Sequence, residues 1–302
     1  MRRILAFYKF HPLSDVEHVR DELEQLGLSQ GIKGTILIAG EGVNGTIVGE
    51  EPALHVIQAA LEQKVGAISF KWSDLDTENL GFYRYKVKVK PEIVSFGVDD
   101  LDLAQTGKHV SPQRWHELLD DPNVVVIDTR NTYEIDIGTF PSALSPDTTN
   151  FREFPQWVEQ NLDPQSTPAV AMFCTGGIRC EKASAYMRQA GFDNVYQLDG
   201  GILQYLEDVE PGGSRWDGEC FVFDQRVSVN EELGQGQYKQ CYACRHPLSA
   251  DDLSADSYEK GVSCRYCFGE RDEVQNKRFR DRQHQVNLAA ERGQQHIGQR
   301  QE

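Results

Sequence analysis

The segment 169–190 constrains the fold of this chain more than any other. An apolar run, 169–173, is followed by Cys174, two glycines and Arg179, and then by a helical pattern over 181–190. This order predicts a strand, a tight loop and a helix, with a thiol as the first residue of the loop. Glycines let backbone N–H groups turn towards an anion, and the helix N-terminus and Arg179 add positive charge. We therefore expect Cys174 to be nucleophilic near neutral pH; the alternative is a buried cysteine at a strand end.

Length and composition fix the broad class of protein. The chain has 302 residues, enough for two or three domains with cores of their own. It contains no apolar run of 18 residues, and Lys9 interrupts the N-terminal apolar stretch, so we expect neither a membrane helix nor a signal peptide. Its seven cysteines include two Cys-x-x-Cys pairs, which suits a reducing cytoplasm better than a disulfide scaffold. The net charge of -16 argues against broad adhesion to nucleic acid but not against a local basic groove.

The first region, 1–98, alternates strand and helix patterns in a way that predicts a ferredoxin-like domain. The order β-α-β-β-α-β follows from strands expected at 3–10, 35–39, 45–48 and 82–89 and helices expected at 15–26 and 51–61. The segment Glu41 to Gly45 either shapes a substrate loop or forms a plain hairpin turn.

The second region, 107–215, has the pattern of a parallel α/β sheet. Ser111-Pro112 predicts a helix start, and fully apolar strands are expected at 124–127, 170–173 and 195–198 with helices between them. Such strands are buried on both faces, and ligands of open α/β sheets lie at the carboxyl ends of the strands, where Cys174 is found. The third region, 216–302, is expected to hold one short strand at 216–224, a cysteine-rich segment and a polar tail.

The cysteine-rich segment has the spacing of a zinc site. Nineteen residues separate the pair Cys241-x-x-Cys244 from the pair Cys264-x-x-Cys267. Four thiolates would hold a structural zinc and leave it no open position for catalysis. Two disulfides or free thiols are the alternative.

A row of cations follows the expected strand at 82–89. Because side chains alternate between the two faces of a strand, Arg84, Lys86, Lys88 and Lys90 lie on one face. They form either a track for phosphates or the solvated face of an edge strand, where lysines block aggregation.

Three motifs give the second region a recognisable resemblance. They are Asp128-Thr129-Arg130 with Glu134, the loop Cys174-Thr175-Gly176-Gly177-Ile178-Arg179, and Leu198-Asp199-Gly200-Gly201. Together they resemble a rhodanese domain, whose six-residue loop Cys-x-x-Gly-x-Arg carries a persulfide on its cysteine. A phosphatase loop would be one residue longer, so the count favours sulfur over phosphate as the bound group.

Further motifs extend the resemblance over essentially residues 1–270. The segments 38–46, 86–94, 174–182 and 220–226 occur in the order found in the bacterial rhodanese-domain tRNA uridine hydroxylases, which the chain closely resembles. That resemblance implies oxygen-dependent 5-hydroxylation of the wobble uridine, position 34, with molecular oxygen as co-substrate, the tRNA anticodon region as partner, and an unidentified sulfur donor or reductant protein. It also favours RNA as the ligand of the cation row. A sulfurtransferase that relays persulfide sulfur to a protein or small acceptor is the alternative function.

The residues themselves offer one reactive group for such a reaction. None of the eight histidines belongs to a His-x-Asp/Glu pair, and no glycine-rich dinucleotide fingerprint for a nicotinamide or flavin cofactor follows a strand. We therefore expect Cys174 to take part covalently, as thiolate, persulfide or oxidised sulfur, with Arg179 beside it. Cys180 is a candidate resolving cysteine, and a small buried residue under the loop is the equal alternative.

Overall fold

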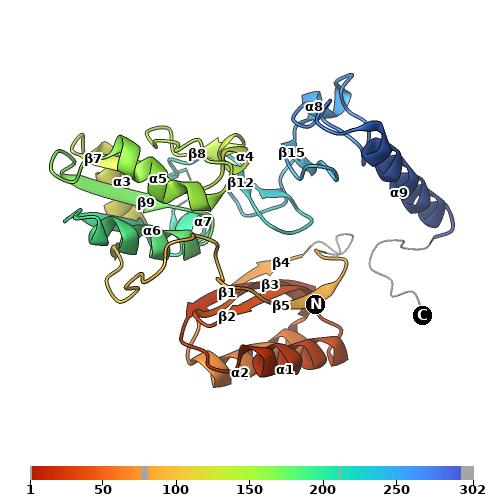
Figure 1. Ribbon diagram of the computed structural model, residues 1–302, viewed down its shortest axis with the longest axis horizontal. Coiled ribbons are helices and arrows are strands. Elements are labelled where there is room, and N and C mark those ends of the chain that lie inside the picture. Colours follow the sequence, from red (N-terminus) through yellow and green to blue (C-terminus); the bar gives the residue numbers. More distant parts are fainter. Residues whose placement is uncertain (1, 76–80, 211, 294–302) are drawn as a thin grey trace.

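The computed structural model describes residues 2–75, 81–210 and 212–293, which form two α/β domains and a cysteine-rich module (Figure 1). The N-terminal domain contains β1 (Arg2–Phe10), α1 (Val16–Ser29), β2 (Lys33–Ala39), β3 (Gly42–Glu50), α2 (Glu51–Val65), β4 (Phe70–Asp74) and β5 (Tyr85–Val89). Its five-stranded sheet has the order β4-β1-β3-β2-β5. The ferredoxin-like plan is thereby confirmed.

The position of the fourth strand differs from the sequence prediction. The strand that completes the ferredoxin-like order is β4, which pairs with β1, whereas β5 is an additional strand parallel to β2 at the opposite edge. Residues 82–89 therefore do contain a strand, β5, but it is not the fourth strand of the ferredoxin-like order. The hairpin between β2 and β3 turns tightly at Gly40 and Glu41, so Gly42 to Gly45 lie within β3.

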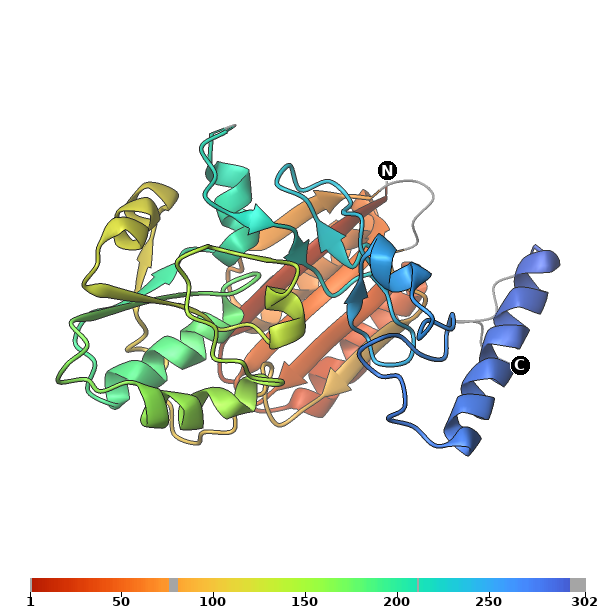
Figure 2. The same ribbon diagram turned by 90° about the horizontal axis from the view of Figure 1, so that it is seen from above.

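Only one face of this sheet is covered by the domain's own helices. Leu5, Phe7, Ile36 and Ile47 point to α1 and α2 and form the core with Leu23 and Ile57. The opposite face carries the alternate residues of each strand and is turned towards the rest of the chain (Figures 1 and 2). This arrangement leaves the broad open face available to line a site.

The second domain contains a four-stranded parallel sheet covered on both faces. Its strands are β6 (Lys108–Val110), β7 (Val124–Asp128), β9 (Ala169–Phe173) and β10 (Val195–Leu198), in the order β6-β10-β9-β7. Its helical elements are α3 (Pro112–Asp120), α4 (Thr132–Ile135), η1 (Phe151–Glu153), α5 (Phe154–Asn161), α6 (Ile178–Gln189) and α7 (Gly201–Asp208). One core packs around Trp115 and Tyr205 and the other around Phe96 and Phe154, so the prediction of a doubly covered parallel sheet is confirmed.

The C-terminal part begins with very short strands rather than the single strand expected over 216–224. β11 (Asp217–Gly218) pairs with β8 (Gly138–Thr139), and β12 (Cys220–Phe221) pairs with β13 (Ser228–Val229). The module that follows holds β14 (Lys239–Gln240), β15 (Pro247–Leu248), α8 (Ala250–Ser254) and the projecting helix α9 (Glu273–Glu291).

A buried lysine fixes the two large domains against each other. Lys182 of α6 is 3% exposed in its side chain and pairs with Glu41 at 2.8 Å and with Glu92 at 2.7 Å. Glu41 also accepts the backbone N–H of Ile93 at 2.7 Å. The turn after β2, the connector after β5 and α6 are thus tied together at one point.

The helices of the described residues show no membrane-spanning candidate, since none is both long and apolar enough to cross a bilayer.

Candidate active site

The loop at the carboxyl end of β9 has the conformation that the sequence predicts. Cys174 follows β9, and α6 begins at Ile178 after Gly177, whose φ of 98° lies in the left-handed region that favours glycine. A neighbouring loop approaches just as closely, because a Cβ at Gly201 would lie 2.4 Å from the carbonyl oxygen of Cys174. The backbone can therefore wrap around the sulfur only with glycine at these positions.

The Cys174 thiol is held in a form that ionises easily. The backbone N–H of Gly177 donates to its Sγ at 3.1 Å. Burial opposes ionisation, but the Cys180 thiol, the Arg179 guanidinium and the N–H groups of Arg179 and Cys180 outweigh it and lower the pKa of Cys174 to about 5. The residue is 1% exposed, so its sulfur lies at the base of the loop with amides directed at it. This geometry is that of a thiolate cradle.

Arg179 does not act as an isolated cation. Its guanidinium donates to both carboxylate oxygens of Glu134, at 2.7 Å each, and Glu134 is fully buried at the N-terminal turn of α4. Burial opposes charge on both groups, yet the pair holds the pKa of Glu134 below its usual range. Glu134 belongs to the sequence motif, but its role as the partner of Arg179 becomes visible only in the structure.

Cys180 lies beneath the loop and is fully buried. Its Sγ is 3.8 Å from the hydroxyl of Thr129, and burial together with the neighbouring Cys174 raises its pKa well above the usual range. Cys174 is therefore the more acidic of the two thiols. Whether Cys180 resolves an oxidised Cys174 stays a prediction.

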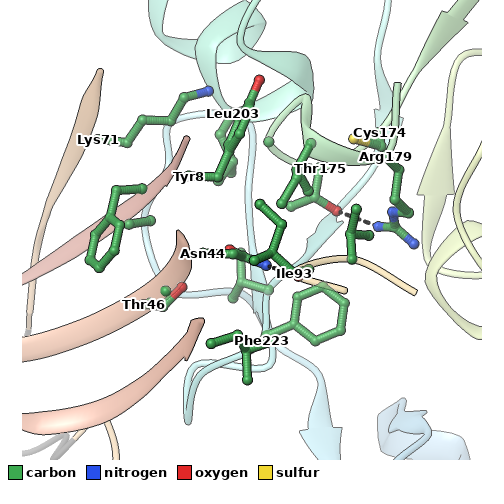
Figure 3. A pocket seen from close by; sticks show the side chains of 18 of the residues that line it. Tyr8, Asn44, Thr46, Lys71, Ile93, Cys174, Thr175, Arg179, Leu203 and Phe223 are labelled. Carbon is green, nitrogen blue, oxygen red and sulfur yellow. Dashed lines mark hydrogen bonds between the residues drawn. The ribbon is translucent and has the colours of Figure 1, made fainter. Parts of the chain in front are cut away.

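A cavity of about 1310 Å³ opens above the cysteine loop, between the open face of the N-terminal sheet and the second domain (Figure 3). Its lining includes Cys174, Thr175, Gly176, Ile178 and Arg179 from the loop. Residues from β1, β2, β3 and β4, from the connector after β5, and from the segments 150–152, 199–207 and 222–233 also line it. Three separate regions of the chain thus build one site.

Two residues from the N-terminal sheet reach the cysteine loop, and sequence analysis did not identify either. The Tyr8 hydroxyl donates to Glu181 at 3.2 Å. The same hydroxyl oxygen would lie 2.9 Å from a Cβ at Gly177. The Lys71 ammonium donates to the carbonyl oxygen of Gly200. Burial lowers the pKa of Lys71, although the negative charge of Cys174 opposes this change. The Lys71 side chain thus lies on the side of the loop opposite Arg179 (Figure 3).

The predicted cation row follows the same open face of the sheet. Arg84, Lys86, Lys88 and Lys90 are exposed, while Tyr85 and Val87 point to the helices. In the pairing of β5 with β2, Lys86 lies beside Thr35 and Lys88 lies beside Leu37. Thr35, Leu37 and Lys90 line the cavity. The row continues the floor of the cavity to the edge of the sheet. Its binding of RNA stays a prediction.

The four cysteines of the C-terminal module come together as a ligand set. The sulfur atoms of Cys241, Cys244, Cys264 and Cys267 all lie within 4.8 Å of one another. The separations of 3.6 Å and 3.8 Å between Cys264 and two of its partners match the edge of about 3.8 Å that a ZnS₄ tetrahedron has with Zn–S bonds of about 2.3 Å. No two of these sulfur atoms are bonded to each other, so the four cysteines do not form two disulfides. None of them lines the cavity.

Family models match both large domains of this chain. Residues 2–93 match the model of the UPF0176 acylphosphatase like domain, and residues 111–208 match that of the rhodanese-like domain. A possible tyrosine phosphatase from Rhodopseudomonas palustris is 20% identical over 37% of this chain and 87% of its own, with a TM-score of 0.32. A rhodanese-like domain from Anabaena sp is 18% identical over 36% and 78%, with a TM-score of 0.29. An acylphosphatase from Bacillus subtilis is 19% identical over 29% and 99%, with a TM-score of 0.23.

The chain therefore joins an acylphosphatase-like domain to a rhodanese-like domain that carries a complete cysteine loop. Its C-terminal module adds a four-cysteine cluster able to bind a metal such as zinc.

Proposed function

We propose that this protein hydroxylates C5 of the wobble uridine, position 34, in tRNA, with Cys174 as the covalent catalyst. The substrate comes from the resemblance to the bacterial rhodanese-domain tRNA uridine hydroxylases. One structural observation supports the proposal independently of that resemblance. The reactive thiol lies at the base of a cavity of about 1310 Å³. Pockets for drug-sized ligands measure about 300–1,000 Å³, so a cavity above that range has room for a nucleotide and its neighbours, whereas thiosulfate would fill only a small part of it.

The electrostatics of the cavity also suit a polyanion. The protein is acidic overall, with a net charge of -16. Lys71 and Lys90 nevertheless line the cavity, and Arg84, Lys86 and Lys88 extend the cationic surface from it. Lysine and arginine rows of this kind bind phosphates and attract nucleic acid over a short range.

The chemistry follows from the thiolate. Sγ of Cys174 adds to C6 of uracil, and the electron pair of the C5–C6 bond moves to C5 and O4 as an enolate. C5 then attacks an electrophilic oxygen formed from O₂, one oxygen atom remaining on C5 and the other leaving as water. Two electrons for that water come from a thiol or persulfide reductant. Loss of the C5 proton and departure of the thiolate restore the aromatic ring as 5-hydroxyuridine.

The residues of the loop have defined parts in this scheme. The N–H of Gly177 and the guanidinium of Arg179 keep Cys174 ionised before addition and accept it as the leaving group afterwards. Lys71, close to the same loop, is placed to balance the charge of the enolate. A metal in the four-cysteine cluster would be structural, because four thiolates leave it no open position.

The test replaces Cys174 with serine in cells that lack the chromosomal copy. We expect 5-hydroxyuridine and the nucleosides derived from it to disappear from position 34 in the Cys174→Ser strain, measured by mass spectrometry of tRNA digests. Cys220→Ser is the matched control, because Cys220 is a buried thiol outside the loop. Full modification in the Cys174→Ser strain would overturn the proposal. Rapid thiocyanate formation from thiosulfate and cyanide, without any change in tRNA, would instead support the sulfurtransferase.

A further inference from the structure

Phe223 is a large apolar side chain that lines the cavity and is not packed into a hydrophobic core. It is 57% exposed and lies among the cavity-lining residues (Figure 3). Its ring meets Phe221 edge-on, with centroids 5.1 Å apart and planes 82° apart. The other exposed large apolar residues in the described part of the chain, Leu28, Val56, Leu144, Phe268 and Val274, all lie outside the cavity lining. Within the cavity, the exposed face of Phe223 is therefore available to a planar ligand.

The turn that presents Phe223 is rigid. The N–H of Val222 donates to the carbonyl of Val227 at 2.9 Å and closes the turn. Inside it, Arg226 is paired with Asp224 at 2.8 Å, and both side chains are nearly buried. The N–H of Gln225 donates to the carbonyl of Gly81 at 3.0 Å, which ties the turn to the N-terminal domain. The ring is therefore held in place before a ligand arrives, so little conformational entropy is lost on stacking.

The wall near Phe223 has the polar groups that a base with a sugar-phosphate would need. Asn44 and Thr46 of β3 lie in the same part of the cavity (Figure 3). The side-chain amide of Asn44 donates to the carbonyl of Ile93 at 2.9 Å, which fixes its orientation. Lys90 lies on the lining as well, at the end of the cation row. A flat apolar face, oriented hydrogen-bonding groups and a cation are what single-stranded RNA readers combine.

We propose that Phe223 is the stacking platform for a nucleobase of single-stranded RNA held in this cavity. This inference rests on the proposed function and adds to it the residue that holds the base. Base–aromatic stacking gives a loss of roughly 5- to 150-fold in affinity when the aromatic side chain is replaced by alanine. The phosphate contacts are made by other residues, so the salt dependence of binding does not change with this replacement.

The experiment measures the Kd of the purified full-length protein for a fluorescent anticodon stem–loop RNA with uridine at position 34, at several salt concentrations. Phe223→Ala is expected to weaken binding roughly 5- to 150-fold with an unchanged salt slope. Phe223→Leu, which keeps apolar bulk but no π face, weakens it nearly as much, and Phe223→Trp retains it. Phe268→Ala is the matched control, because Phe268 is 65% exposed and outside the cavity.

Each outcome bears on a separate statement. Wild-type affinity in Phe223→Ala, or an equal loss in Phe268→Ala, overturns the stacking inference while wobble hydroxylation by the wild type stands. Restoration by tryptophan but not by leucine supports the inference, because a change that only disturbed folding would not distinguish these two. Failure of the wild type to bind the RNA, with 5-hydroxyuridine unchanged in the deletion strain, removes the proposed function and the inference together.

Discussion

At the scale of single residues, the thiolate of Cys174 depends on several neighbouring groups and not on Arg179 alone. Arg179 shares its charge with Glu134 through two hydrogen bonds of 2.7 Å. The remaining stabilisation comes from the Cys180 thiol and from N–H groups at the start of α6, one of which, Gly177, lies 3.1 Å from Sγ. Ionisation therefore requires the glycines of the loop as much as the guanidinium.

A pH profile of alkylation tests the ionisation of Cys174. Its pKa is lowered to about 5, so the thiolate predominates above that pH, and the rate of reaction with iodoacetamide should fall only as the pH drops through about 5. Peptide mass spectrometry after timed labelling from pH 4 to 9 measures the rate at each cysteine. Cys220, whose pKa burial raises to about 12, serves as the internal control and should label slowly throughout. A half-maximal rate for Cys174 near pH 8.5, as for a free thiol, would contradict the cradle.

At the scale of elements, α6 has two tasks. Its N-terminus forms one side of the cysteine loop, and one turn further on Lys182 pairs with Glu41 and Glu92. A shift of the N-terminal domain against α6 would therefore also change the position of the cysteine loop. The helix links the position of the open sheet face to the position of the thiol.

Replacing Lys182 with methionine should loosen the contact between the domains. The change leaves Glu41 and Glu92 close together without a cation, and the free energy of unfolding should fall by about 2 kcal/mol, less than for a fully buried pair because both carboxylates are partly exposed. Hydrogen exchange should accelerate at Ile93 and Phe96, whose N–H groups bind these two carboxylates.

Lys64→Met is the control for this change, since Lys64 pairs with Glu22 within the N-terminal domain. Protection at Ile93 and Phe96 that is the same in Lys182→Met as in the wild type would contradict the role given to Lys182.

The elements also show how far the sequence could be interpreted. The strand, loop and helix around Cys174 were predictable because apolar residues, glycines and a helical pattern follow one another without interruption. β4 was not predicted, although Phe70 and Trp72 alternate with Lys71 and Ser73, because the pattern is short and the cation-bearing strand β5 gave a stronger signal. Because Lys71 belongs to β4, its place in the site could not be predicted either. Tyr8 and Phe223 could not be assigned either, since local patterns do not reveal which strand face meets another domain.

At the scale of the whole molecule, the cysteine cluster stabilises a part with little apolar core. The module's core consists of Cys241, Cys264 and Cys267 with Leu248, and the described residues of α9 include none that is buried. Arg280 attaches α9 to the module through two hydrogen bonds to Glu259, of 2.7 Å and 2.8 Å. A core this small is one that a bound metal can stabilise.

Metal analysis of the purified protein should give one zinc per chain. Cys264→Ser, or treatment with a strong chelator, should remove it, and hydrogen exchange should then accelerate over 238–291 while β9 and α6 keep their protection. Inductively coupled plasma mass spectrometry gives the stoichiometry. Cys220→Ser should retain the metal, since Cys220 belongs to β12 and not to the cluster. A chain without zinc whose module is equally protected would contradict this prediction.

The residues that line the cavity extend along the chain from Ile4 to Leu233, so the cavity cannot be complete until most of the protein has been synthesised. The ribosome releases the sheet floor first, the thiol loop next and the turn with Phe223 last. A nascent chain halted after α7 would hold a reactive sulfur without the wall that admits one kind of molecule and keeps others away. Selectivity is therefore acquired only when translation has passed the second domain.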